Sequence, residues 1–264
     1  MATSIAFLVA FSLGIYYLFK RSYLKIRWSA FKFSKYIIKD IFSVGGSSTL
    51  TMLLISIYII IINRLMAHFG TENVASVAIV FRIENIATMP VMGLSMALVT
   101  LVGMFYGARR FDLLKGIIYY GMKIGLLYTS IMGVIFFIIP QPFFRIFTPD
   151  TNLLSLGSAY MRINVFTFPL MVIAMIVSRA MQGMGYGLPG LIINVFRVIL
   201  VAVPLAYIFV FILGYGYLSI GVAAVLGGIT SSIVGLVWLQ TKLKKITIHS
   251  FLELSNNEIG DGKA

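Results

Sequence analysis

Apolar residues come in runs of about twenty along most of this chain. Because a helix rises ~1.5 Å per residue, a run of that length crosses the ~30 Å hydrocarbon core of a bilayer. The longest run reaches from Asn73 to Gly107. The pattern predicts an all-α integral membrane protein, with helices at residues 2–19, 44–63, 73–107, 114–139, 149–182, 190–212 and 218–240.

Polar segments divide the chain into four parts. We expect residues 1–19 to form a partial or short transmembrane helix and residues 20–41 a basic amphipathic cytoplasmic connector. Residues 42–246 then form a six-helix lobe, and residues 247–264 a cytoplasmic polar tail. Lysines and apolar residues form two stripes along residues 32–41, which is typical of a helix at a membrane surface. A solvated link that only fixes the topology is the alternative.

Local signals predict where helices begin and where they pack. Thr148 is the expected N-cap of helix 149–182, with Pro149 in its first position. Glycines four residues apart let helix backbones approach each other. This spacing occurs in the pairs Gly103/Gly107, Gly121/Gly125 and Gly183/Gly187.

The composition excludes a soluble domain. Of the 264 residues, 60% are hydrophobic and only 11% charged, whereas a soluble surface needs more charge than this. The net charge of +13 comes from bases that cluster beside the spans, so the positive-inside rule explains it better than nucleic-acid binding. We therefore expect a multi-pass plasma membrane protein with the amino end outside and the carboxyl end cytoplasmic.

Enzyme and cofactor signatures are absent from the sequence. His68 and His249 are far apart, no HExxH motif or nucleophile elbow is present, and the chain has no cysteine. The Gly183-Met-Gly185-Tyr-Gly187 segment follows no strand, so it indicates a tight turn between helices and not a nucleotide site. We expect neither catalysis nor a bound cofactor.

Only one of the eight acids falls inside a predicted span. Glu84 lies in helix 73–107, where a carboxylate is costly unless it is paired, protonated or hydrated. Arg82 lies two residues away, about 200° around the helix, so the two side chains leave from different faces. Glu84 is therefore a functional candidate. The alternative is that both side chains reach water at the outer interface.

A weak internal repeat surrounds Glu84. Residues 82–92 and 162–171 share Asn five positions before a proline, Thr two before it and Met two after it. Kinked helices with polar residues at matched depth border the cavity of secondary transporters, although generic kinking is an alternative. The candidates for a transport pathway or ion coupling are Glu84, Arg82, Asn85, Thr88, Arg162, Asn164 and Thr167, with hinges at Pro90 and Pro169. The prolines leave the carbonyls of Ile86 and Val165 without a donor, and we expect Thr88, Thr167 or water to satisfy the freed groups.

Five further segments, distributed over about residues 40–245, have a recognisable order and spacing. They are Val102-Gly103-Met-Phe-Tyr-Gly107-Ala108-Arg109, Phe144 to Ile163, Arg179-Ala-Met-Gln-Gly183-Met-Gly185, Val203-Pro204-Leu205-Ala-Tyr207 and Gly221-Val-Ala-Ala224. Together they resemble the carboxy-terminal lobe of multidrug and toxic compound extrusion (MATE) transporters.

The resemblance implies multidrug efflux by a secondary active antiporter. Such a transporter exchanges a drug-like, often cationic, compound for inward H⁺ or Na⁺ by rocking two six-helix lobes. This chain resembles one lobe, so its implied partners are the lipid bilayer, a small organic substrate, and either the missing amino-terminal lobe or a second copy of itself. Some members carry coupling acids in the first and fourth helices of this lobe. The matching segments 44–63 and 152–182 contain no Asp or Glu, which leaves Glu84 or the missing lobe.

Two other hypotheses stay open. A lipid-linked sugar flippase of the same superfamily would use a groove lined by bases such as Arg82, Arg162, Arg179 and Arg197. A truncated product would have no transport activity of its own. A membrane-embedded prenyltransferase is excluded, because the sequence lacks the paired Asp-rich motifs that bind Mg²⁺ and diphosphate.

Overall fold

The fold is described from a computed structural model that covers residues 2–21 and 34–261. Among these residues every regular element is a helix, which confirms the all-α prediction. The elements are α1 (Ala2–Arg21), α2 (Lys35–Ala67), α3 (Thr71–Gly107), α4 (Phe111–Ile138), α5 (Pro140–Arg145), α6 (Thr151–Asn164), α7 (Thr167–Gly183), α8 (Leu188–Val195), π-helix η2 (Phe196–Ala202), α9 (Val203–Tyr207), π-helix η3 (Ile208–Ile212) and α10 (Leu218–Asp261).

The chain divides into two compact units, residues 1–39 and 40–264. The first unit contains α1, whose apolar part spans Ile5–Tyr17 and is shorter than the ~20 residues of a full span. Most of the predicted connector 20–41 lies outside the described residues. Its last part belongs to α2, which begins at Lys35.

The second unit forms the predicted membrane lobe. Within the described residues five helices are long and apolar enough to cross a bilayer. A sixth span is present when α6 and α7, which meet at a bend of 50°, are taken together. The prediction of a six-helix membrane lobe is therefore confirmed.

Two predicted boundaries differ from the structure. Helix α6 begins at Thr151, and its N-cap is Asp150, not Thr148. The Asp150 carboxylate accepts hydrogen bonds from the backbone N–H groups of Asn152 and Leu153, which a helix start otherwise leaves without partners. Helix α10 continues to Asp261, so the segment predicted as a polar tail is helical over most of its length.

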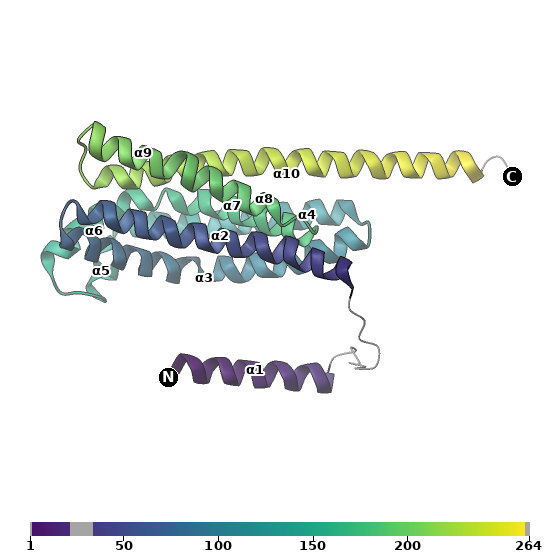
Figure 1. The fold of residues 1–264 in the computed structure, drawn as a ribbon, viewed down its shortest axis with the longest axis horizontal. Coiled ribbons are helices and arrows are strands. Elements are labelled where there is room, and N and C mark those ends of the chain that lie inside the picture. The colour runs from purple at the N-terminus through teal and green to yellow at the C-terminus, as the bar shows by residue number, and fades with distance from the viewer. Residues whose placement is uncertain (1, 22–33, 262–264) are drawn as a thin grey trace. The chain divides into compact units, whose positions relative to one another are not determined.

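Helices α3, α4, α6, α7 and α10 make the main contacts of the lobe (Figure 1). Their buried side chains form two apolar clusters. One includes Val80, Phe144 and Phe168, and the other includes Leu98 and Ile176. Because lipid tails are as apolar as these side chains, close packing and not the hydrophobic effect must hold such helices together.

Glycine permits a close approach between α3 and α7. A Cβ added to Gly183 would lie 2.6 Å from the backbone oxygen of Val99, and one added to Gly103 would lie 3.2 Å from the backbone oxygen of Gly183. A Cβ on Gly107 would meet nothing within 4 Å. The glycine spacing therefore identified a helix contact, but only one glycine of the first pair takes part in it.

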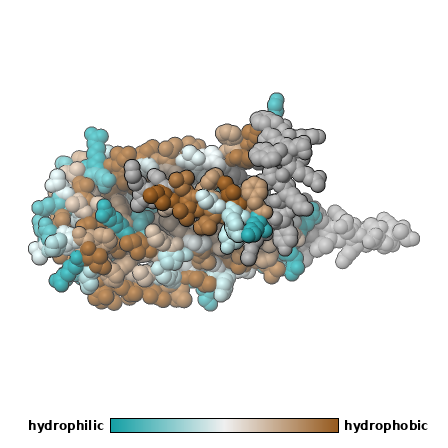
Figure 2. Space-filling view, turned by 90° about the horizontal axis from the view of Figure 1, so that it is seen from below, coloured by the Kyte–Doolittle hydropathy of each residue, from teal (hydrophilic) through white to brown (hydrophobic). Residues whose placement is uncertain are grey.

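The surface agrees with a membrane environment. Large apolar side chains are exposed on α2, α4 and α10, among them Leu53, Leu127 and Val237. Figure 2 shows many apolar residues on the surface of the lobe and hydrophilic residues mainly near its ends. An apolar band between polar ends is what a lipid-exposed helix bundle requires.

Candidate functional site

Glu84 joins two helices that are distant in the sequence. Its Oε2 on α3 accepts a hydrogen bond of 3.0 Å from Nδ2 of Asn164, the last residue of α6. Asn164 is 4% exposed, whereas Glu84 is half-buried. A hydrogen bond from an amide N–H to a carboxylate is charge-assisted, and such a bond is stronger than one between neutral groups. The structure thus brings together two of the predicted site residues.

Three further side chains surround this pair. Arg197 on η2, Tyr58 on α2 and Tyr160 on α6 all lie close enough to Glu84 to interact electrostatically with its carboxyl group. Among the described residues Glu84 and Arg197 do not form a direct ion pair. We call Glu84, Asn164, Arg197, Tyr58 and Tyr160 the Glu84 cluster.

The backbone around Arg197 is not α-helical. Residues Phe196–Ala202 form a π-helix, and Pro204 follows two residues later. Proline has no N–H to continue the hydrogen-bond ladder, so the preceding turns change their pitch. π-Helical turns inside longer helices are often found at functional sites.

The threonines of the repeat bond locally. Thr88 Oγ1 donates to the carbonyl of Glu84 at 2.9 Å and to that of Asn85 at 3.2 Å, and Thr167 Oγ1 donates to the carbonyl of Asn164 at 2.7 Å. Neither hydroxyl reaches the carbonyl of Ile86 or Val165, so the threonines do not replace the donors lost at the prolines. The backbone N–H of Phe168 takes the Val165 carbonyl instead. Both threonines lie beside the cluster and fix its backbone.

The two prolines have different structural effects. Pro90 lies inside α3, which remains one continuous helix. Pro169 is the third residue of α7, just after the bend that separates α6 from α7. That bend directly follows Asn164.

The remaining predicted residues lie apart from the cluster. Arg82, Asn85 and Arg162 are exposed, and the Asn85 amide bonds the carbonyl of Phe81 in its own helix. Within the described part of the chain neither arginine has a hydrogen bond or an ion pair. They lie on the outer surface of the lobe, where another helix, lipid or water can reach them.

Tyr58 and Tyr160 were not identified from the sequence, and Arg197 was named only as a groove base in the flippase hypothesis. Tyrosines in apolar spans resemble ordinary core residues, and Tyr160 is indeed almost fully buried. Arg197 is the only base of span 190–212, and that isolation was the available signal.

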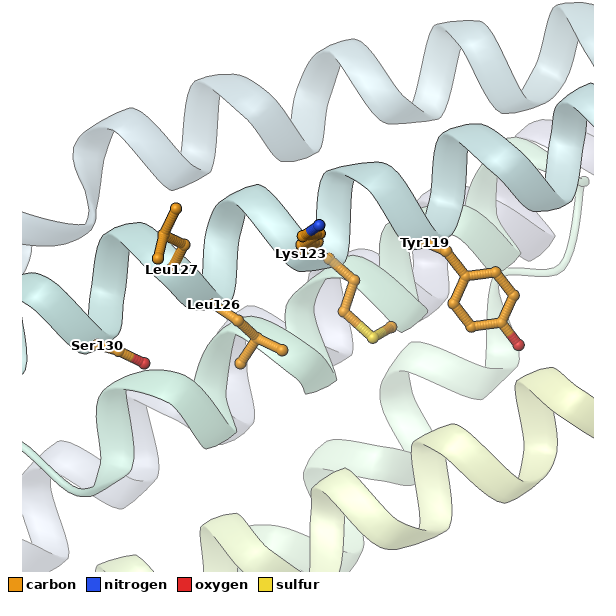
Figure 3. A pocket seen from close by; sticks show the side chains of 6 residues that line it. Tyr119, Lys123, Leu126, Leu127 and Ser130 are labelled. Carbon is orange, nitrogen blue, oxygen red and sulfur yellow. The ribbon is translucent and has the colours of Figure 1, made fainter.

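A shallow pocket on α4 is separate from this cluster. Tyr119, Met122, Lys123, Leu126, Leu127 and Ser130 line it, all from one helix (Figure 3). Its lining is mostly apolar and shares no residue with the Glu84 cluster. Among the described residues no three His, Asp or Glu side chains meet in a way that could hold a metal ion.

Comparisons with known sequences give a consistent result. The MatE family profile matches residues 48–208. The chain is 27% identical over 218 residues to the probable multidrug resistance protein NorM of Thermotoga maritima, covering 80% of this chain and 45% of that protein. It is 25% identical over 191 residues to the multidrug export protein MepA of Staphylococcus aureus, covering 71% of this chain and 42% of that protein.

Solved structures with the same fold include a MATE protein in its bent conformation. It superposes with a TM-score of 0.85 at 26% identity, over 92% of this chain and 54% of that one. A transporter of the MOP superfamily from Pyrococcus furiosus gives the same score and identity, over 90% and 54%, and is described as having a binding pocket of reverse polarity that suggests a different function. The chain thus spans about half the length of the proteins it matches.

Proposed function

The chain belongs to the MatE family, and on this premise we propose that it supplies one six-helix lobe of a drug exporter. The substrates are drug-like organic compounds, often cations. The names of the multidrug relatives support the drug-like class. Export is driven by inward movement of H⁺ or Na⁺. The chain is a multi-pass membrane protein, and we place it in the plasma membrane with its amino end outside.

The observation that carries this proposal is the half-buried Glu84 carboxylate held by Asn164. A carboxylate inside a span persists where it has partners, and such groups mark ion and substrate paths. Asn164 holds the carboxyl group by a hydrogen bond, and the Arg197 guanidinium lies close enough to attract it. A proton or Na⁺ arriving from outside neutralises the carboxylate, which weakens its hydrogen bond to Asn164 and its attraction to Arg197, and release of the ion inside restores both.

The coupling element is the bend between α6 and α7. Asn164 lies at the end of α6, immediately before the bend, so losing its bond to Glu84 frees α6 from α3 at this point. A ligand shifts a conformational equilibrium only through such a difference in contacts between two states. Pro169 lies at the start of α7 and acts as the hinge.

The second lobe is either an amino-terminal lobe or a second copy of this chain. Arg82, Asn85 and Arg162 are exposed within spans, where polar side chains without partners in lipid are costly. A second lobe placed against these residues would enclose a polar cavity. In a homodimer both copies would be related by a twofold axis along the membrane normal.

Substitution of Glu84 tests the proposal. Glu84→Gln keeps the shape of the side chain but removes the charge, so gradient-driven efflux of ethidium should be lost while the amount of protein in the membrane stays normal. Glu72→Gln, on the same helix but bonded to Asn152 at its end, is the matched control. The assay is run in cells without other exporters, with this chain alone and with an amino-terminal MatE lobe. Undiminished efflux in Glu84→Gln cells would contradict the role of the carboxylate.

The mass of the purified chain tests the need for a second lobe. We expect a dimer that exports drug, or a monomer that exports only when the amino-terminal lobe is present. A monodisperse monomer that exports drug alone would show that the lobe requires no partner.

A lipid-linked sugar flippase is the second candidate. Arg197 lies in the Glu84 cluster, and Arg82 and Arg162 are exposed on α3 and α6, the helices that carry Glu84 and Asn164, so bases outnumber acids in this part of the lobe. This polarity favours an anionic substrate such as a diphosphate. Ethidium efflux that depends on Glu84 would decide against it.

A further inference from the structure

The side chains around the Glu84 carboxylate are mainly hydrogen-bond donors. The Asn164 amide presents its nitrogen, and not its oxygen, to Glu84 Oε2 at 3.0 Å. Arg197, half-buried and close enough to interact electrostatically with Glu84, is a cation without an acceptor atom. The hydroxyls of Tyr58 and Tyr160 complete the cluster. The only anionic oxygens among these five side chains are therefore those of Glu84 itself.

Backbone carbonyls near the cluster are already engaged. In broken membrane helices such carbonyls can coordinate a cation, and the bend between α6 and α7 is the nearest break in this chain. The three carbonyls at the bend all accept hydrogen bonds: that of Ile163 from the N–H of Phe166 at 3.3 Å, that of Asn164 from Oγ1 of Thr167 at 2.7 Å, and that of Val165 from the N–H of Phe168 at 3.1 Å. On α3 the carbonyl of Glu84 accepts from Thr88. The backbone therefore offers little to a cation at this point.

Two buried side-chain oxygens of the described chain have no hydrogen-bond partner, Oδ1 of Asn73 and Oγ of Ser158. Neither lies at the level of the cluster. Asn73 precedes Glu84 on α3 by about 16 Å along the helix axis, and Ser158 precedes Asn164 on α6 by about 9 Å. These oxygens cannot complete a ligand shell around the Glu84 carboxylate.

This arrangement treats Na⁺ and a proton differently. Na⁺ without its water needs several oxygen ligands, as other hard cations do, and a neighbouring positive charge repels it. Beside Glu84 it would find one carboxylate and the guanidinium of Arg197. A proton needs only one lone pair of a carboxylate oxygen, and the neutral acid avoids the cost of a charge inside a span. The Glu84 cluster therefore favours a proton.

We propose that the ion bound by Glu84 is a proton and that the Glu84 cluster does not bind Na⁺, an inference that rests on the proposed function. H⁺ adds to one carboxylate oxygen and turns an acceptor-only group into an acid with one O–H donor. The Asn164 amide then faces a weaker acceptor, and Arg197 loses its negative neighbour. Release of H⁺ reverses each change. Arg197 is the fixed cation that keeps the site closed to Na⁺.

Infrared difference spectroscopy of the full chain in lipid nanodiscs tests the proposal without transport. Labelling the carboxyl carbon of glutamate with ¹³C separates the four glutamates of the chain from its four aspartates. On acidification the wild type should gain a labelled carboxylic-acid band that Glu84→Gln lacks. Glu72→Gln, on the same helix and outside the cluster, is the matched control and should retain this band.

The pH titration of that band decides between the two ions. It is repeated at constant ionic strength with Na⁺ in place of choline, and we expect the same midpoint. If Na⁺ competed for the carboxylate, the apparent proton affinity would fall about tenfold for each tenfold rise in Na⁺ above its dissociation constant. Such a fall, or a Glu84 band that never appears, would overturn the proposal.

Glu84→Asp covers the case in which Glu84→Gln does not fold, because aspartate keeps the charge. In protein labelled on glutamate, this variant should lose the labelled band and gain an unlabelled one whose midpoint is equally insensitive to Na⁺. A labelled band that persists in Glu84→Asp would show that it comes from another glutamate, and Glu84 would then not be the proton site.

Transport separates failure of this inference from failure of the proposed function. In proteoliposomes that export ethidium, an inward pH gradient alone should drive efflux that depends on Glu84, and an inward Na⁺ gradient at equal pH should not. Efflux driven by Na⁺ and abolished in Glu84→Gln would overturn the choice of the proton but leave the proposed function intact. Efflux that is unchanged in Glu84→Gln under either gradient would remove the role of Glu84, and both proposals would fall.

Discussion

Asn164 on α6 donates a 3.0 Å hydrogen bond to Glu84 on α3, across a separation of 80 residues. Asn152 and Glu72 form a hydrogen bond at the same separation. Gly103 and Gly183, where the two backbones come close together, are also 80 residues apart. A constant offset means that α3 and the α6–α7 pair run parallel and stay in register over three contact points. The sequence repeat around the two prolines therefore corresponds to two parallel helices in direct contact.

The Glu84–Asn164 bond should appear as a coupling energy. Glu84→Leu and Asn164→Leu each leave one polar group of the pair without its partner, whereas the double variant leaves neither. We expect the double variant to be less destabilised than the sum of the singles, by about 1.5–3 kcal/mol, the range for a bond to a charged group. Denaturant titration in mixed micelles measures each free energy of unfolding. Additive effects would show that the pair contributes nothing to folding.

Gly183 should not tolerate a methyl group. In Gly183→Ala the added Cβ would meet the Val99 carbonyl oxygen at 2.6 Å, and backbone atoms cannot turn away as a side chain does. Such overpacking costs about 1–3 kcal/mol. Gly107→Ala, also at the last residue of a helix, meets open space and should be neutral. Thermal unfolding in detergent compares them, and equal melting temperatures would contradict the observed helix contact.

Asp150 should stabilise α6 as its N-cap. Asp150→Ala removes the acceptor for two backbone N–H groups and should destabilise the lobe by about 0.5–2 kcal/mol. Thr151→Ala, at an exposed position one residue later, should have little effect. The free energy of unfolding of both variants provides the check. A larger loss of stability in Thr151→Ala than in Asp150→Ala would show that Asp150 is not the main cap of α6.

The two ends of α2 should face opposite sides of the membrane. The helix has 33 residues, so at ~1.5 Å per residue it is long enough to cross the bilayer. Because the chain contains no cysteine, single cysteines at Ser34 and Thr71 can be labelled without background. We expect an impermeant maleimide added to intact cells to label Thr71→Cys and not Ser34→Cys. The reverse pattern would invert the proposed topology.

The sequence by itself determined the membrane class and the number of spans in the lobe. Apolar runs are readable because the thickness of the bilayer fixes their length, and this holds whatever the helices contact. Glu84 was also identifiable, since a lone acid in such a run is costly wherever it faces. The repeat likewise identified Asn164, although as a residue at matched depth and not as the partner of Glu84.

The tertiary structure decided which groups meet. Whether Asn164 bonds Glu84, and whether Arg197 and Tyr58 join them, depends on the rotation and register of helices that are distant in the chain. No local pattern contains this information. The unequal effects of Pro90 and Pro169 have the same origin: each removes one hydrogen bond, but the packing around it determines whether the helix continues or bends. The apolar runs determined that the lobe is a bundle of membrane helices, and contacts between those helices determined which of its polar and charged groups lie next to one another.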